Sequence, residues 1–98
     1  MEVEFGDADS NRLWGDARFD GGFDRDVVKA YRKAMAIVLA ATDERDFRNH
    51  KGLHYEKLTG RDHQRSMRLT RKWRLIVEVI DGVTKIVRIL EISNHYDD

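Results

Sequence analysis

The sequence predicts an α+β fold, with helices in the first half packed on a small, mainly antiparallel sheet formed by the second half. Three observations support this class. Apolar residues recur at helical spacing within residues 23–42, apolar and polar residues alternate from residue 53 onward, and Asp81-Gly82 separates the last two alternating runs. A chain of 98 residues can bury one modest core, so we expect a single domain over residues 1–98.

The first half is expected to contain one short strand and two helices. Residues 3–5, "VEF", alternate with glutamates and predict an edge strand with Val3 and Phe5 turned inward. After the breaker "DGG", residues 23–42 predict the main helix, with Asp24 as its N-cap. Its core-facing stripe is Val28, Tyr31, Met35 and Val38 or Leu39. The segment "DERDFRN", residues 43–49, predicts a second short helix capped by Asp43.

Four strands are expected in the second half, over residues 53–58, 65–70, 73–80 and 84–92. A two-residue type I′ turn at Asp81-Gly82 would pair Glu78 with Lys85 and Arg74 with Ile89. On that register one face carries Arg74, Ile76, Glu78, Lys85, Val87, Ile89, Glu91, Ser93 and His95. The more apolar face, which should meet the main helix, carries Trp73, Leu75, Val77, Val79, Ile86 and Leu90.

The turn before the third of these strands decides where Arg68 lies. A two-residue turn at Arg71-Lys72 would place Arg68 opposite Leu75, on the helix side of the sheet, whereas a bulge would move it. Arg74 is therefore the better placed of the two arginines for a role on the other face.

Positive charge is concentrated in residues 48–74, which hold nine Lys and Arg against two Asp and Glu, although the whole chain has a formal net charge of zero. A local cluster of cations suits a phosphate-bearing partner. Alternatively, about half of these cations pair with the acidic N-terminal third. The chain has no cysteine and begins with acidic residues, and its longest apolar run, residues 34–41, is too short to span a bilayer. We therefore expect a cytoplasmic protein without a membrane partner.

Histidines among these cations suit metal-free RNA cleavage, because imidazole can exchange protons near neutral pH and arginine can hold a phosphate. His50 and His63 are more simply interpreted as solvated surface residues. A zinc site at His50, His54 and His63 is disfavoured, because Gly52 interrupts the helical turn that would bring the first two together. We therefore expect neither a metal nor a cofactor.

Two strings of the sequence carry a resemblance: "LHYEKLTGRDHQRSMRLTRKWRLIVEV" and the terminal "ILEISNHYDD". Together with "VVKAYRKAM" and "DERDF", they resemble the HigB-like toxins of the RelE/ParE superfamily, the killer proteins of plasmid-maintenance modules. The resemblance spans most of the chain and implies a RelE-like fold. It also implies a type II toxin that cleaves messenger RNA on the ribosome as a metal-independent endoribonuclease and thereby inhibits translation.

The resemblance implies a set of site residues. Lys57 and His54 lie in and before the "EKLTG" loop, Arg74 follows the hairpin tryptophan, and His95 and Tyr96 fall on a terminal Asp-Tyr-His motif. Here that motif reads Asn94-His95-Tyr96, with an amide for the aspartate and the last two residues exchanged. A structural alternative for Arg74 is an ion pair with Glu78 or Glu91. The cations expected to bind RNA phosphates are Arg61, Arg65, Arg68, Arg71 and Lys72.

The implied partners are the ribosome with its mRNA and a HigA-like helix-turn-helix antitoxin, with operator DNA reached only through the antitoxin. Two alternatives belong to other classes. One is a ParE-like toxin that acts on DNA gyrase without catalysis, and the other is an inactive RNA-binding member of the family.

Overall fold

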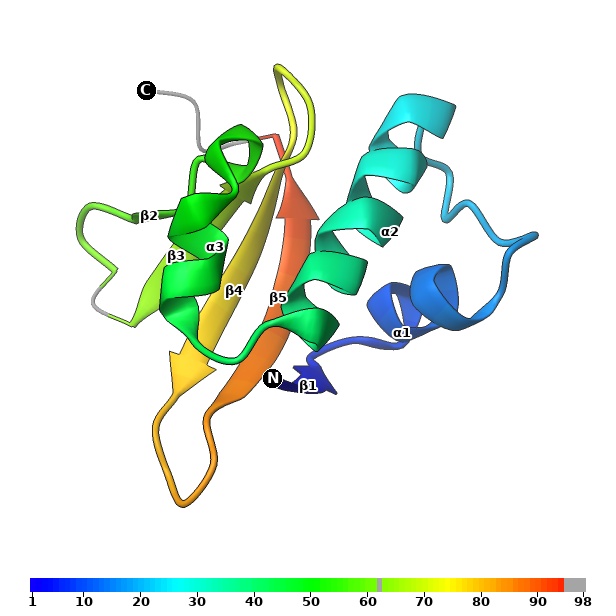
Figure 1. Ribbon diagram of the computed structural model, residues 1–98. Coiled ribbons are helices and arrows are strands. Elements are labelled where there is room, and N and C mark those ends of the chain that lie inside the picture. Colours follow the sequence, from blue (N-terminus) through cyan, green and yellow to red (C-terminus); the bar gives the residue numbers. More distant parts are fainter. Residues whose placement is uncertain (62, 95–98) are drawn as a thin grey trace.

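The computed structural model describes residues 1–61 and 63–94, and in them helices cover one face of a five-stranded sheet (Figure 1). The elements are β1 (Glu2–Phe5), α1 (Ala8–Gly15), α2 (Arg25–Ala40), α3 (Glu44–Asn49), the 3₁₀ turn η1 (Lys51–Leu53), β2 (Glu56–Lys57), β3 (Gln64–Arg68), β4 (Arg74–Ile80) and β5 (Ile86–Ser93). The α+β class is thus confirmed. Within these residues no helix is long and apolar enough to span a bilayer.

The two predicted helices and the first strand are confirmed. The side chains of Val3 and Phe5 pack against the core, and β1 runs parallel to β5 at the sheet edge. The core-facing side of α2 buries Val38 and leaves Leu39 42% exposed, which decides between the two alternatives. Asp43 caps α3 by accepting a hydrogen bond from the Arg45 amide at 2.8 Å. The pattern of apolar spacing therefore located the elements of the first half correctly, except for one.

The exception is α1, a helix that the sequence analysis treated as a polar stretch. Asp7 caps it by accepting a hydrogen bond from the Ser10 amide at 2.7 Å, but Leu13 is the one apolar residue that it buries. So short a helix with so little periodicity is stabilised mainly by tertiary contacts. The buried hydroxyl of Tyr31 donates to the Ser10 carbonyl at 2.8 Å, and Arg32 donates to the Leu13 carbonyl at 3.0 Å.

The strand order is β1-β5-β4-β3-β2, and the β4–β5 connection differs from the predicted turn. Ile80 pairs with Ile86, so residues 81–85 form a longer loop, and Glu78 faces Arg88 instead of Lys85. This register places Val87 and Ile89 in the core, where both are fully buried. The two-residue turn would have turned them to the other face, so the burial of these side chains outweighs the preference of Asp-Gly for a tight turn.

A β-bulge in β5 then shifts its pairing register with β4 by one residue. Val77 pairs with Ile89 but Ile76 pairs with Glu91, so Leu90 is the extra residue, and the side chains of Glu91, Ile92 and Ser93 change face. We call the sheet face opposite the helices the outer face. Leu75, Val77 and Val79 lie on the helix face as predicted, and Arg74, Ile76, Glu78, Glu91 and Ser93 lie on the outer face as predicted. The predicted faces of Val87, Ile89 and Ile86 are wrong, and Lys85 lies in the loop.

Candidate phosphate-binding site

Three strand ends meet at one end of the outer face. β3 ends at Arg68, β4 begins at Arg74 and β5 ends at Ser93. Arg74 lies between the other two, because it pairs with Arg68 on one side and with Ser93 on the other. Figure 1 shows this end of the sheet beside the β3–β4 turn. Two arginines and the last described residues of the chain are thereby brought together.

The β3–β4 turn sets this arrangement. The Leu69 amide donates to the Trp73 carbonyl at 2.9 Å, and the Trp73 amide lies 3.3 Å from the Thr70 hydroxyl oxygen. The Trp73 ring packs edge-on against Phe23, with 5.4 Å between the ring centroids. Residues 69–73 therefore form the turn, and a two-residue turn at residues 71–72 does not occur.

The expectation that Arg68 lies opposite Leu75 is consequently wrong. Met67 occupies that position and is fully buried, whereas Arg68 lies opposite Arg74 on the outer face. A slip of one residue would exchange them and put the guanidinium group into the core. The cost of burying that charge explains the observed register.

Two like charges directly opposite each other on neighbouring strands are unfavourable. Glu56 offsets part of this repulsion, because its Oε1 lies 3.5 Å from Nη1 of Arg74. The Arg74 side chain is 19% exposed and that of Glu56 is 60% exposed, so the anion covers the arginine from the solvent side. Arg74 thus forms an ion pair with a carboxylate, as the alternative to a functional role predicted, but its partner is Glu56 instead of Glu78 or Glu91.

Two buried polar groups beside this pair lack acceptors among the described residues. They are the Ser66 hydroxyl and the Nε of Arg68, which lie two residues apart on β3 and so share the outer face. Most buried donors in proteins are satisfied, so each exception requires an explanation. Both groups lie on the sheet face that carries Arg74, so an acceptor for them would have to come from above this end of the outer face.

The structure separates the other predicted site residues of this region. Lys57 lies opposite Arg65 on the two-residue edge strand β2, and it is Glu56 that shares a face with Ser66 and Arg74. His54 is exposed at the end of η1 in a left-handed conformation, with φ of 45°. His is one of the residue types enriched in that region. The roles of Lys57 and His54 stay predictions.

The remaining cations do not form one patch. Arg61 and His63 lie in the connection before β3, where Arg61 donates to the Gln64 side chain at 3.0 Å. Arg71 and Lys72 are exposed in the turn after β3, at the opposite end of that strand. The cations of this basic stretch are thus separated in space, because some lie at one end of β3 and some at the other. Arg65, between them, lies opposite Val77.

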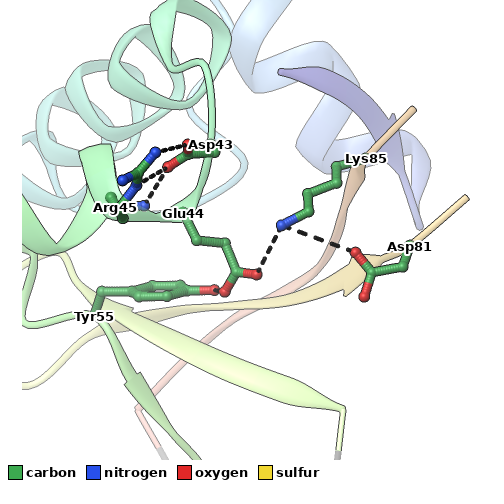
Figure 2. A network of polar contacts seen from close by, with 6 residues as sticks. All are labelled: Asp43, Glu44, Arg45, Tyr55, Asp81 and Lys85. Atoms are coloured by element: carbon green, nitrogen blue, oxygen red, sulfur yellow. Dashed lines mark hydrogen bonds and ion pairs between the residues drawn. The ribbon is translucent and has the colours of Figure 1, made fainter. Parts of the chain in front are cut away.

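Tyr55 fixes the position of the segment that leads into β2 (Figure 2). Its hydroxyl donates to Oε2 of Glu44 at 2.8 Å, and Oε1 of Glu44 lies 3.9 Å from the Lys85 ammonium group. Lys85 also lies 4.0 Å from Asp81, so the β4–β5 loop is connected to the start of α3. Burial, and next the hydrogen bond to Glu44, raises the pKa of Tyr55. This phenol is therefore a structural donor.

His95 and Tyr96 lie outside the described residues, and Ser93, opposite Arg74, shows where the preceding strand ends. Sequence reasoning missed Glu56 and Ser66 as members of the site. A signal for Glu56 was present, because it is one of only two acidic residues among 48–74. Ser66 had no such signal, since its place beside the arginines depends on the register of β3.

The arrangement defines an α+β domain with two arginines at one end of its sheet. No protein-family model and no curated protein matches the sequence. Among solved structures, a YoeB/ParE toxin from Agrobacterium tumefaciens is similar, with a TM-score of 0.59 over 98% of this chain and 100% of that chain. The two sequences are 16% identical. The chain therefore has the fold of a YoeB/ParE toxin.

Proposed function

We propose that this protein, as one domain over residues 1–98, is the toxin of a type II toxin-antitoxin system and a metal-independent endoribonuclease that cleaves mRNA on the ribosome. The observation that carries the proposal is the pairing of Arg68 with Arg74, because the Nε of Arg68 and the nearby Ser66 hydroxyl are buried without an acceptor among the described residues. The likeness in fold to a YoeB/ParE toxin and the HigB-like sequence motifs support it.

The reaction needs fixed positive charge more than any other feature. The 2′-oxygen of the RNA bonds to the adjacent phosphorus as it loses its proton to a base, and the bond to the 5′-oxygen breaks as that oxygen takes a proton from an acid. Between the formation of the first bond and the breaking of the second, negative charge accumulates on the phosphate oxygens. Arg68 and Arg74 stabilise that charge because they are held in place before the reaction begins.

The other roles follow from the sequence resemblance. His54 and His95 are the proposed acid and base, Lys57 contacts the backbone from the edge strand, and Tyr96 stacks on a base or relays a proton. Arg61, Arg65, Arg71 and Lys72 are the further proposed phosphate contacts, with Arg61 before β3 and Arg71 and Lys72 after it. The proposed partners are the ribosome and a HigA-like antitoxin, which alone contacts operator DNA.

Induced expression in a bacterial host tests this function. The wild type should arrest growth and produce new 5′ ends inside translated codons of a reporter mRNA, mapped by primer extension. Arg74→Ala, Arg68→Ala and His95→Ala should lose both effects. Arg88→Ala is the matched control, because Arg88 lies on the same face but faces Glu78 and pairs with Glu4 at 2.9 Å. Harmless expression of a folded wild type would reject the toxin function.

A second candidate is a ParE-like toxin that inhibits DNA gyrase without catalysis. The Glu56–Arg74 ion pair favours it, because a carboxylate already occupies the guanidinium that a nuclease needs free. This candidate predicts growth arrest without new 5′ ends, and it predicts that His95→Ala remains toxic.

A further inference from the structure

The connection between α1 and α2 ends in a tight turn that presents one aromatic ring. Its sequence "FDGGF", residues 19–23, contains two glycines with positive φ, 62° at Gly21 and 83° at Gly22. Asp20 fixes the turn, because its Oδ1 accepts from the Gly22 amide at 2.9 Å and its carbonyl accepts from the Phe23 amide at 3.0 Å. Local hydrogen bonds thus set the direction in which Phe23 leaves the loop.

Arg32 attaches this connection to α2. Its guanidinium group donates to the carbonyls of Leu13, Asp16 and Phe19 at 3.0, 3.1 and 3.1 Å. Hydrogen bonds from a charged donor are stronger than those between neutral groups. The connection is therefore held at three points by one side chain of the helix, and it forms a fixed support for Phe23.

Phe23 contacts Trp73, the residue that precedes Arg74. The two rings meet edge-on, with 5.4 Å between their centroids and 87° between their planes. An aromatic pair of this kind contributes stabilisation beyond the area that it buries. The Trp73 carbonyl also accepts from two amides of the β3–β4 turn. The ring contact therefore connects the α1–α2 loop to the turn that lies between the two arginines.

Trp73 and Arg74 are consecutive, and they serve opposite faces of the sheet. The Trp73 ring meets Phe23 from the helix layer, whereas Arg74 lies on the outer face opposite Arg68. Because one peptide unit joins the two residues, a rotation of Trp73 about the strand would turn Arg74 with it. The like charge of Arg68 favours such a displacement, so Arg74 needs a support on the other side of the sheet.

We propose that Phe23 is a positioning residue of the candidate phosphate-binding site, which holds Arg74 opposite Arg68 through its contact with Trp73. The expected effect on RNA rests on the proposed function. The positions of the two arginines can be measured without it.

The first measurement is the binding of a short single-stranded RNA by Phe23→Leu, followed by fluorescence anisotropy at several salt concentrations on the purified full chain. Affinity should fall by about twofold to tenfold, because an aromatic pair can bias the position of Trp73 by no more than its own contribution. The salt dependence of binding should also become weaker, since fewer cations reach phosphates together. A loss of stability alone would leave the salt dependence of the folded protein unchanged. Phe23→Tyr keeps the ring and should bind as the wild type does.

Phe19→Leu is the matched control, because it makes the same substitution in the same loop. The Phe19 ring lies against Arg12 instead, with 4.2 Å from its centroid to the guanidinium carbon. This variant should keep the affinity and the salt dependence of the wild type. Circular dichroism and thermal unfolding establish that each variant is folded, and Phe23→Met, which fills more of the same space, replaces Phe23→Leu if the latter does not fold.

A double-mutant cycle tests whether the effect passes through Trp73. Phe23→Leu should weaken RNA binding in the wild-type background and have little further effect in a Trp73→Leu background. Additive losses would mean that Phe23 acts on the site by another route and would overturn the proposal.

The second measurement needs no RNA. Nε of Arg68 is buried, so its N–H group should exchange slowly with water and give a signal in a heteronuclear NMR spectrum. Arg68→Lys and Arg74→Lys assign the two Nε–H signals. Phe23→Leu should shift both signals and speed the exchange at Arg68, whereas Phe19→Leu should do neither.

Unchanged arginine signals in Phe23→Leu, equal changes in Phe19→Leu, or weak RNA binding by Phe23→Tyr would also overturn the proposal. If the signals change but the wild type binds no RNA and is harmless in cells, the positioning role stands and the proposed function fails. If the wild type cleaves mRNA and the signals do not change, the proposed function stands and the positioning role fails.

Discussion

Oε1 of Glu56 lies 3.5 Å from Nη1 of Arg74, so the central arginine of the candidate phosphate-binding site already holds an anion of its own chain. Glu56 belongs to a strand of only two residues at the sheet edge, and its side chain is 60% exposed. Such a partner can be displaced by a phosphate at little cost, because exposed ion pairs contribute about 0–1 kcal/mol.

Glu56→Gln is expected to strengthen RNA binding. Removing the competing charge leaves Arg74 available to the RNA. The energy of an exposed ion pair, about 0–1 kcal/mol, corresponds to an increase in RNA affinity of up to about fivefold at low salt. Binding of a short single-stranded RNA, measured by anisotropy at two salt concentrations, checks this. Glu78→Gln, on the same face but opposite Arg88, is the control. Equal effects of both variants would point to net charge as the cause.

Arg68→Met is expected to stabilise the fold while it weakens RNA binding. The substitution removes a like charge from the position opposite Arg74 and a buried Nε without an acceptor among the described residues. We expect the free energy of unfolding to rise by about 0.2–1 kcal/mol, measured by urea denaturation. A loss of stability would show that Arg68 is held by favourable contacts and would weaken its assignment to the site.

The buried phenol of Tyr31 and the partly buried phenol of Tyr55 predict loss of stability at high pH. Burial is the main cause that raises the pKa of Tyr31 and of Tyr55 above the ordinary value of 10.0. The folded state therefore keeps protons that the unfolded state releases. The associated stability is fully present below about pH 10 and is lost as the pH rises through the folded pKa values.

Urea denaturation at about pH 8 and about pH 10.5 tests this prediction. The free energy of unfolding of the wild type should decrease between the two conditions. Tyr55→Phe should cost about 1 kcal/mol at the lower pH, where it removes the hydrogen bond to Glu44, and should show a smaller decrease at the higher pH. An equal decrease in the variant would exclude Tyr55 as a source.

Gly82→Ala distinguishes the observed β4–β5 loop from a tight turn. A type I′ turn requires positive φ at both central residues, so alanine would be strained there. In the structure Gly82 is not among the positive-φ residues, and an added Cβ comes no closer than 3.5 Å to another atom. Gly82→Ala should therefore be neutral or stabilise by up to about 1 kcal/mol.

Gly60→Ala is the contrasting variant, because Gly60 has φ of 77° and open space around it. It should lower the free energy of unfolding by about 1 kcal/mol. If Gly82→Ala proves as costly as Gly60→Ala in urea denaturation, the two-residue turn would be the better description of the loop.

The sequence patterns predicted those elements that have a strong period. They located α2 and the strands β3, β4 and β5, because each buries a continuous stripe or face of apolar side chains. The strand predicted over residues 53–58 is reduced to Glu56–Lys57, which is exposed at both residues. They did not predict α1, whose single buried apolar residue, Leu13, gives no period. The β3–β4 and β4–β5 connections were both predicted wrongly, and for the same reason. The strand register was predicted from the preference of local residues for tight turns, whereas the burial of Met67, Val87 and Ile89 determines it.

The candidate site was predicted unevenly for the same reason. Arg74 follows the hairpin tryptophan and could be selected from the sequence motif. Arg68, which pairs with Arg74 from the neighbouring strand, was predicted on the wrong face because the predicted register was off by one residue. Glu56 contacts Arg74 from β2, a strand that is not adjacent to β4. Contacts between non-adjacent strands are not visible in local sequence patterns.

The parallel pairing of β1 with β5 has a consequence for synthesis. Glu4 and Arg88, 84 residues apart in sequence, form an ion pair across these two strands, and β5 lies between β1 and β4 in the sheet. While the chain emerges from a ribosome, β1 has no partner until β5 is made, and Arg74 lacks one of its neighbours until Ser93 follows. Helices α1 to α3 can form earlier because their contacts are more local. The nascent chain therefore completes the surroundings of Arg74 as one of its last steps, and a product cut short before β5 would contain Arg68 and Arg74 but lack the strand on the other side of Arg74.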